Sequence, residues 1–274
     1  MLRKLIKHEF KSTSKIMLAI YAFIAVVTIF GIITFTLVDS FPDSSLLNYM
    51  NVAMLVLYFL SIFALFIATY IYMCVHFYKT MYSEQGYLTH TLPVSPLTNL
   101  HVKIGVSFFW MIASCLVMLL SLFLLLLGIT HGKLMSIFTP EKIALLNEIL
   151  SESGLTLTAG SMGGYIIICA LISCLSYLLI VFASISIGQL FNQNKIRFSI
   201  IVGIAIYFIE QILGTMTISI VMIPSADDML YAETEFTSTF VNHTMVSSLL
   251  VSLFFSIVLY IICNVIVRKH INLE

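Results

Sequence analysis

One acidic side chain lies in the middle of an apolar stretch of this 274-residue chain. Glu210 is about halfway along the run 199–223, which contains no other Asp, Glu, Lys or Arg. A carboxylate there costs about 2.5–3.5 kcal/mol on membrane-insertion scales, so we expect it to face other helices or water rather than lipid. Small and polar residues recur around it at intervals of four and three, forming one helical stripe: Gly203, Tyr207, Glu210, Gly214 and Thr217. The stripe predicts either a surface on a translocation path or a helix interface, and both interpretations stay open here.

A second candidate site is the polar segment 79–103, KTMYSEQGYLTHTLPVSPLTNLHVK, which is too long for a tight turn and too polar to lie in lipid. Pro93 and Pro96 interrupt helix because each lacks an amide hydrogen and restricts the residue before it. Gly86 permits a sharp bend after a short helix that carries Glu84. These residues predict a helix–loop–helix along the membrane surface, either an organised intracellular element or a passive connector between two spans.

Other chemistries find little support in the sequence. The five cysteines lie inside apolar runs without CxxC spacing, so we expect small buried side chains rather than disulfides or a zinc site. A phosphate-binding P-loop needs Gly-x4-Gly-Lys-Ser/Thr, and the nearest string, GITHGKL at 128–134, has the wrong spacing. The apolar runs also lack paired acids, a histidine cluster or an activated nucleophile. We therefore expect no enzyme activity, cofactor or metal in this chain.

Membrane-spanning helices must position these candidate residues. With 60% hydrophobic and 9% charged residues, the chain cannot cover a water-facing surface with polar groups. Crossing about 30 Å of hydrocarbon takes about 20 helical residues, and continuous apolar runs favour helices over alternating barrel strands. Six segments are long enough: 16–38, 52–78, 104–130, 163–190, 199–223 and 246–267. The predicted fold is an all-α polytopic membrane protein, with a single transmembrane domain over 1–274.

An amphipathic helix is predicted over 1–15, ahead of the first span. One helical face holds Leu2, Leu5, Ile6 and Phe10, and the other holds Arg3, Lys4, Lys7 and Lys11. A basic face beside an anionic leaflet gains about 1 kcal/mol per charge. We predict an interfacial helix that anchors the chain on membrane lipids and sets its topology, with a docking contact for a cytosolic subunit as the alternative.

The distribution of charge predicts the orientation. Segments 1–15, 79–103, 191–198 and 268–274 hold eleven of the 13 Lys and Arg residues, whereas nine of the 13 acidic residues fall in the other loops. The excess of positive charge places the first set of segments in the cytosol. We therefore expect a multi-pass protein of the plasma membrane, in a bacterium, with both termini cytosolic. The net charge of zero gives no argument for binding nucleic acid.

Packing and loop signals complete the prediction. Thr139 and Pro140 are typical of a helix start, and Gly154 of its end. The spacings Gly160-x3-Gly164 and Ser184-x3-Gly188 predict close approach of helices as ordinary packing. The acidic segment 224–245 is predicted to be a solvated connection.

The pattern Glu84-x-Gly86-Tyr87-Leu88-Thr89-x-Thr91-Leu92-Pro93-Val94-Ser95, between the second and third spans, resembles permease subunits of type-two ATP-binding-cassette (ABC) exporters. The six-span layout and the amphipathic N-terminal helix extend the resemblance over nearly the whole chain. In that family this loop contains the coupling helix, which sits in a cleft of the cytosolic ATPase. The resemblance implies that the ATPase-coupling loop of this chain contains Glu84, Gly86, Tyr87, Thr89, Leu92 and Pro93.

The resemblance also implies a division of labour. This chain would form the membrane pathway as one of two identical or similar permease chains, while separate cytosolic ABC ATPase subunits bind ATP and Mg. We expect export of a hydrophobic or amphipathic substrate, such as an antimicrobial peptide or a drug. Two alternatives stay open: a proton-coupled secondary transporter that uses Glu210, and a non-transporting membrane sensor or structural partner.

Overall fold

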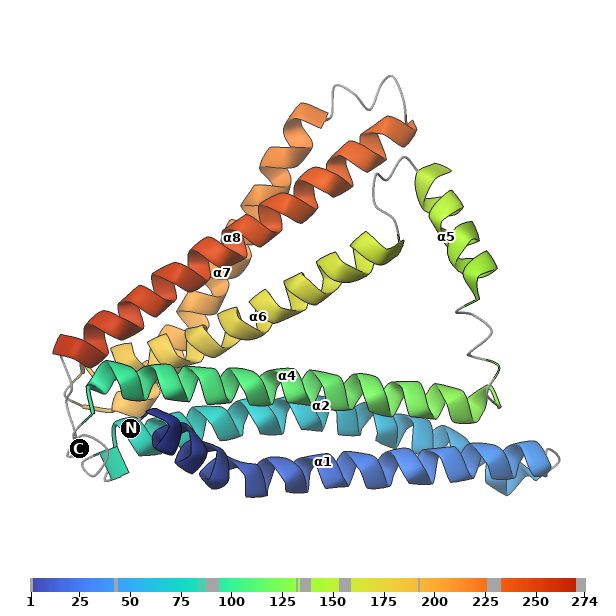
Figure 1. Cartoon of the computed structure of the whole chain (residues 1–274), viewed down its shortest axis with the longest axis horizontal. Coiled ribbons are helices and arrows are strands. Elements are labelled where there is room, and N and C mark those ends of the chain that lie inside the picture. Colours follow the sequence, from blue (N-terminus) through green and yellow to red (C-terminus); the bar gives the residue numbers. More distant parts are fainter. Residues whose placement is uncertain are drawn as a thin grey trace. The chain divides into compact units, whose positions relative to one another are not determined.

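The structure is a computed structural model that describes residues 2–41, 44–83, 85–86, 94–131, 133, 139–152, 159–191, 193–225 and 233–269. Within these ranges the regular secondary structure is helical and no strand occurs. Figure 1 shows the helices α1 (Leu2–Ser40), α2 (Ser45–Met81), α4 (Pro96–Ile129), α5 (Pro140–Glu152), α6 (Ala159–Gly188), α7 (Lys195–Ser225) and α8 (Glu233–Lys269).

Six of these helices are long and apolar enough to cross a membrane: α1, α2, α4, α6, α7 and α8. The seventh, α5, has 13 residues, which is too short to span the hydrocarbon. Its first residue is Pro140, as predicted, because a proline at the first helical position has no amide hydrogen bond to lose. The fold is therefore that of an all-α polytopic membrane protein, and this confirms the predicted fold class.

The helices extend beyond the predicted spans. The N-terminal segment and the first span form one helix of 39 residues, and α8 begins at Glu233, inside the segment predicted to be a solvated connection. An apolar window detects the part of a helix that matches lipid, whereas the helix itself continues until a residue breaks it. Pro96 marks such a boundary, because it is tolerated only in the first turn of α4.

The first turns of α1 lie at an angle to the rest of that helix (Figure 1). The Thr13 hydroxyl donates to the Glu9 carbonyl oxygen four residues earlier, at 3.0 Å. A hydroxyl that bonds back to the preceding turn commonly bends a helix, because it competes with the backbone amide for the same carbonyl.

The described helices belong to two compact units. Unit 1 consists of Met1–His76 and His101–Thr139, and unit 2 of Phe77–Leu100 and Pro140–Glu274. Unit 1 thus holds α1 and most of α2 and α4, which run side by side in Figure 1. Unit 2 holds α5 to α8 together with the C-terminal end of α2 and the first residues of α4.

The core of unit 1 lies where α1, α2 and α4 meet. One cluster of buried side chains consists of Met17, Met73, Val102, Val106 and Trp110. A second cluster consists of Val27, Tyr58 and Leu125. The outer faces of the same helices carry exposed Leu, Ile, Val and Phe side chains, as expected where lipid rather than water covers a protein.

In unit 2, α6 packs against both α7 and α8, and α5 contacts α6. The C-terminal third of α6 is the most buried part of this unit, with Phe182 and Ala183 fully buried. Phe77, at the end of α2, stacks on Phe182 with ring centroids 3.8 Å apart. The end of α2 therefore has a packing partner of its own in unit 2.

Candidate functional site

A buried charge cluster joins α1, α2 and α4 within unit 1. Lys103 Nζ donates a hydrogen bond to Glu9 Oε1 at 3.0 Å, and His76 Nε2 lies 2.7 Å from the same oxygen. Glu9 is 8% exposed and Lys103 is 3% exposed. Charges removed from water in this way persist only when they are paired, so each of these side chains depends on the others. We call these three residues the Glu9 cluster.

The inward face of α1 explains why an acidic residue is buried there. Glu9, Thr13 and Met17 follow one another at intervals of four and are all buried. Leu5, one turn before Glu9 on the same line, and Phe10 beside it pack against the core. Leu2 and Ile6, predicted to lie on the same apolar face as Leu5 and Phe10, are 52% and 36% exposed. The face that packs against α2 and α4 is thus centred on Glu9.

A line of polar side chains continues from the Glu9 cluster along unit 1. Trp110 Nε1 donates to the Thr13 hydroxyl at 2.8 Å. In the next layer the Ser114 hydroxyl lies 3.0 Å from the Tyr21 hydroxyl and 3.1 Å from the Thr69 hydroxyl.

In the last layer of this line, the Ser121 hydroxyl lies 2.7 Å from the Tyr58 hydroxyl and accepts from Thr28 at 3.2 Å. We call the residues of these three layers the polar seam: Thr13, Tyr21, Thr28, Tyr58, Thr69, Trp110, Ser114 and Ser121. Ser114 and Ser121 each serve two neighbouring helices, so α4 is the helix that the other two share.

The polar seam consists of separate layers rather than a continuous chain. Ser114 and Ser121 are seven residues apart, about 10 Å along a helix, which exceeds the reach of a hydrogen bond. The hydroxyl groups of Ser114 and Ser121 are therefore not linked directly, and the chemistry of these layers is that of positioning. Each pair of hydroxyl groups can form its hydrogen bond only when the two helices keep one position along their axes.

Sequence reasoning missed the Glu9 cluster and the polar seam, although α4 carries a signal. Lys103, Trp110, Ser114 and Ser121 recur at intervals of seven, four and seven, which places them on one helical face. Polar residues with this spacing at the start of an apolar run favour an inward-facing stripe. Lys103 is the last residue of the predicted loop 79–103. Glu9 lies in the amphipathic helix that was predicted over 1–15.

Most of the residues named for the predicted coupling loop lie outside the described residues. Glu84, Tyr87, Thr89, Leu92 and Pro93 fall in that group, whereas Gly86 is described. Gly86 is buried, and its amide donates to the Ser83 carbonyl oxygen at 2.6 Å.

The two ends of the predicted coupling loop are anchored within unit 2. On the α2 side, the fully buried Tyr82 donates its hydroxyl hydrogen to Ser186 Oγ of α6 at 2.8 Å. On the α4 side, Asn99 Nδ2 donates to the Met81 sulfur at 3.3 Å and Leu100 is fully buried. Both stems of the loop are therefore held by buried contacts.

The Glu210 stripe lies partly on the face of α7 that packs against α6. A Cβ on Gly203 would lie 3.3 Å from Ser184 Oγ, and Tyr177 of α6 is close enough to Tyr207 and Glu210 to interact with them electrostatically. Among the described residues, Glu210 Oε2 is buried without a hydrogen-bond partner.

The other end of the stripe is more open. Tyr207 is 44% exposed, and a Cβ on Gly214 would meet nothing within 4 Å. The Thr217 hydroxyl is occupied by the Leu213 carbonyl oxygen of its own helix, at 2.7 Å. Gly203 thus lies against α6, Tyr207 and Glu210 lie near Tyr177 of the same helix, and Gly214 has open space around its Cβ position.

The predicted close approach of helices occurs at one of the two small-residue spacings. A Cβ on Gly188 would collide with Ser199 Oγ and come within 2.8 Å of the Ser199 Cα, so α6 and α7 approach closely there. Next to this contact Gln189 is fully buried, and its side-chain oxygen and nitrogen have no hydrogen-bond partner among the described residues. Gly160 and Gly164 have open space around them.

The cysteines and acidic residues add no further centre in the described part of the chain. In the described part of the chain, none of the five cysteines forms a disulfide. The described residues contain no group of three or more His, Cys, Asp and Glu side chains placed to hold a metal ion.

Six apolar helices, a charge cluster buried between three of them and a lone acidic residue on α7 define the class to which this chain belongs. It is a multi-pass α-helical membrane protein. No protein-family model, no curated protein and no solved structure matches the chain.

Proposed function

We propose that this chain is the membrane-spanning permease subunit of an ATP-driven ABC exporter. Two such chains, identical or similar, would pair with separate cytosolic ATPase subunits that bind ATP and Mg. The substrate would be hydrophobic or amphipathic, such as an antimicrobial peptide or a drug. The protein would lie in a bacterial plasma membrane with its termini in the cytosol.

The observation that carries the proposal is how segment 79–103 is held at its base. His76 precedes this segment and Lys103 is its last residue, and both contact Glu9 of α1. Inside those residues, Tyr82 is fixed to Ser186 and Asn99 to Met81. A passive connector between two spans needs no such anchors. A loop that transmits a movement from a partner protein needs such anchors. Without them the loop would move alone, and the helices on either side of it would keep their positions.

The mechanism follows from these anchors. An ATPase that closes on nucleotide would displace the loop that carries Glu84, Gly86 and Tyr87. The displacement would pass through the anchored stems, into α1 by way of Glu9 and into α6 by way of Tyr82. In this mechanism α1, α2 and α4 would move as one set, because the polar seam holds these three helices in register.

The experiment that tests this proposal is a mild-detergent pull-down of the tagged chain from its native membrane. We expect wild type to recover a cytosolic ATPase, and a variant with Glu84→Lys, Leu92→Ala and Pro93→Ala to lose it while still being expressed. Glu148→Lys on α5 is the matched charge reversal, because Glu148 is exposed and lies on the side predicted to be extracellular. Recovery of no ATPase with wild type in several detergents would contradict the proposal.

A second candidate function is proton-coupled secondary transport, favoured by the buried Glu210 oxygen that lacks a partner among the described residues. A carboxyl group that binds and releases a proton during transport would need such an unoccupied position. Glu210→Gln should abolish transport under a proton gradient if this function is correct. Unchanged transport at unchanged expression would remove any need for a charge at Glu210 and leave a structural role.

A further inference from the structure

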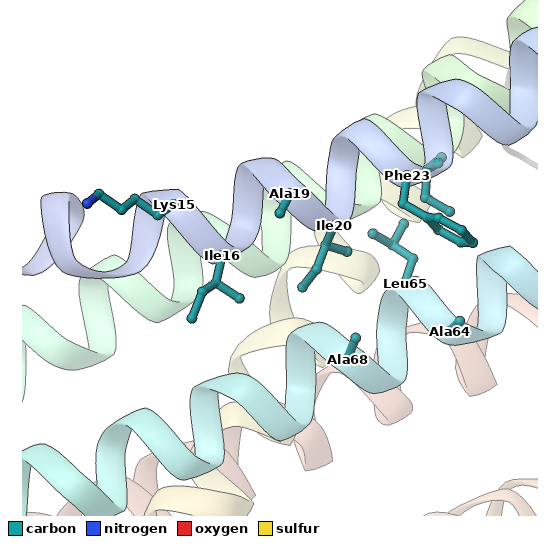
Figure 2. Close-up of a pocket in the computed structure, with 9 residues that line it drawn as sticks. Lys15, Ile16, Ala19, Ile20, Phe23, Ala64, Leu65 and Ala68 are labelled. Atoms are coloured by element: carbon teal, nitrogen blue, oxygen red, sulfur yellow. The ribbon is translucent and has the colours of Figure 1, made fainter.

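A groove on the surface of unit 1 runs between α1 and α2 (Figure 2). Its volume is about 430 Å³. Its floor contains Ile24 and Leu65, each 1% exposed, while Ile16 and Phe23 on its rim are 45% and 53% exposed. The groove exists because the facing positions hold alanine, whose small side chains leave the space unfilled: Ala19 on α1, and Ala64 and Ala68 on α2.

A basic depression adjoins the apolar groove on α1. It has a volume of about 360 Å³ and is lined by His8, Lys11, Ser12 and Lys15, which lie on one helical face. Lys15 lines both cavities. In Figure 2 its side chain extends away from Phe23, towards the N-terminal end of α1. One face of α1 therefore changes from basic to apolar at Lys15.

We propose that this groove binds one anionic phospholipid. The phosphate group lies against Lys11 and Lys15 with the Ser12 hydroxyl as a further donor, and an acyl chain lies along the groove towards Phe23. Lys15 and Phe23 are eight positions apart, about 12 Å along the helix, a length that an acyl chain exceeds. Lys15, where the basic depression meets the apolar groove, would lie at the depth where the headgroup of a lipid joins its hydrocarbon chains.

Charge complementarity selects this occupant. Two ammonium groups and a hydroxyl fit a phosphate that carries a net negative charge, whereas the phosphate of a zwitterionic lipid is already offset by its own cation. A protein helix would fill the apolar groove but would place no anion at Lys11 and Lys15 unless it carried one at that depth. The inference depends on the membrane class of the protein and is independent of the proposed transport function.

Native mass spectrometry of the purified full chain tests the proposal, after incubation with equal amounts of phosphatidylglycerol and phosphatidylcholine. We expect wild type to retain phosphatidylglycerol with at least about a tenfold preference. Lys11→Gln with Lys15→Gln should reduce that preference to about twofold or less. Both lysines are exposed, so this variant keeps its core.

The control variant Arg3→Gln with Lys7→Gln removes the same charge at the same spacing. Arg3 and Lys7 are exposed on the same helix but do not line the depression. This variant should keep the wild-type preference for phosphatidylglycerol. An equal loss in both double variants would overturn the proposal, because the preference would then follow net charge rather than a site.

A second pair of substitutions tests the apolar part of the site. Ala64→Leu with Ala68→Leu fills the groove with side chains, so retention of phosphatidylglycerol should fall about tenfold although every lysine remains. Unchanged retention in this variant would refute the placement of the acyl chain. Loss of a dimer by the same variant, with lipid retention unchanged, would show that the groove is an interface between copies and would also overturn the proposal.

Discussion

Glu9 is the one acidic residue among five basic ones in the first fifteen positions, and its burial gives that exception a physical reason. It neutralises Lys103, which belongs to unit 1 and is the last residue of segment 79–103. A buried ion pair adds little net stability compared with apolar side chains, because each charge loses its hydration. The ion pair adds specificity instead, because α1 and α4 can pack only in the arrangement that brings Glu9 and Lys103 together.

Replacing Glu9 by Gln should therefore destabilise the protein more than its small change in shape suggests. The substitution leaves Lys103 charged and buried, which costs about 3–5 kcal/mol when one partner of a buried pair is lost. Thermal unfolding in detergent, followed by the fluorescence of Trp110, measures this effect next to the cluster. Trp110 is the single tryptophan of the chain and it contacts Thr13 of α1.

Two further variants separate the pair from a general effect of charge. Glu148→Gln removes an exposed carboxylate from α5 and should leave the unfolding temperature unchanged. Glu9→Gln combined with Lys103→Met removes both charges and should be more stable than Glu9→Gln alone. If the double variant is the less stable of the two, the cluster contributes through packing and not through charge.

Gly188 is a residue whose lack of a side chain matters. Gly188→Ala should lower the free energy of unfolding by about 1–3 kcal/mol, because the new Cβ meets the Ser199 backbone and neither helix can yield without losing other contacts. Gly164→Ala in the same helix is the control, since nothing lies within 4 Å of its Cβ position. Equal stability of the two variants in a thermal unfolding assay would argue against the close approach of α6 and α7.

At the scale of elements, α6 is fixed against α8 by a pair of serines. The hydroxyls of Ser176 and Ser256 lie 2.6 Å apart, and both residues are buried. Cysteines at these two positions, in a chain whose five native cysteines are replaced, should form a disulfide on mild oxidation. The shift of one protein band in non-reducing electrophoresis measures it.

The pair Ser176→Cys with Ser248→Cys serves as the control for this disulfide. Residue 248 lies eight positions before 256, about 12 Å along α8, which is beyond the reach of a disulfide. Cross-linking of both pairs at similar rates would mean that α6 and α8 slide past each other.

The existence of the helices was predictable, as were the start of α5 at Pro140 and the close approach at Gly188, whereas most other helix ends and contacts were not. Continuous apolar runs revealed all six candidate spans, because nothing else in a chain of this composition can hold 20 residues away from water. The start of α8 at Glu233 was missed because a polar helical turn has no apolar period to detect. The pairing of Glu9 with Lys103 was missed because the two residues are 94 positions apart, and sequence spacing does not say which helical faces meet.

At the scale of the whole molecule, the six candidate spans would place both termini on one side of the membrane if each one crosses it. We expect green fluorescent protein fused after residue 274 to fluoresce, because it folds only in the cytosol. Alkaline phosphatase fused after residue 148 should be active, because that position in α5 is predicted to be extracellular. Activity of the phosphatase after residue 274 would contradict the orientation that the distribution of Lys and Arg predicts.

The polar seam has a consequence for the order of events during synthesis. The partners of Tyr21 and Thr28 on α4 lie 93 residues further along the chain, and those of Tyr58 and Thr69 lie 63 and 45 residues further. A ribosome adding about 5–20 residues per second needs roughly 5–20 s to make the 93 residues that separate Tyr21 from Ser114. Until α4 has been made, the hydroxyls of α1 and α2 lack these final partners. Insertion of α4 is therefore the event that turns three separate helices into unit 1, and a pause in translation before Ser121 would delay assembly of that whole unit.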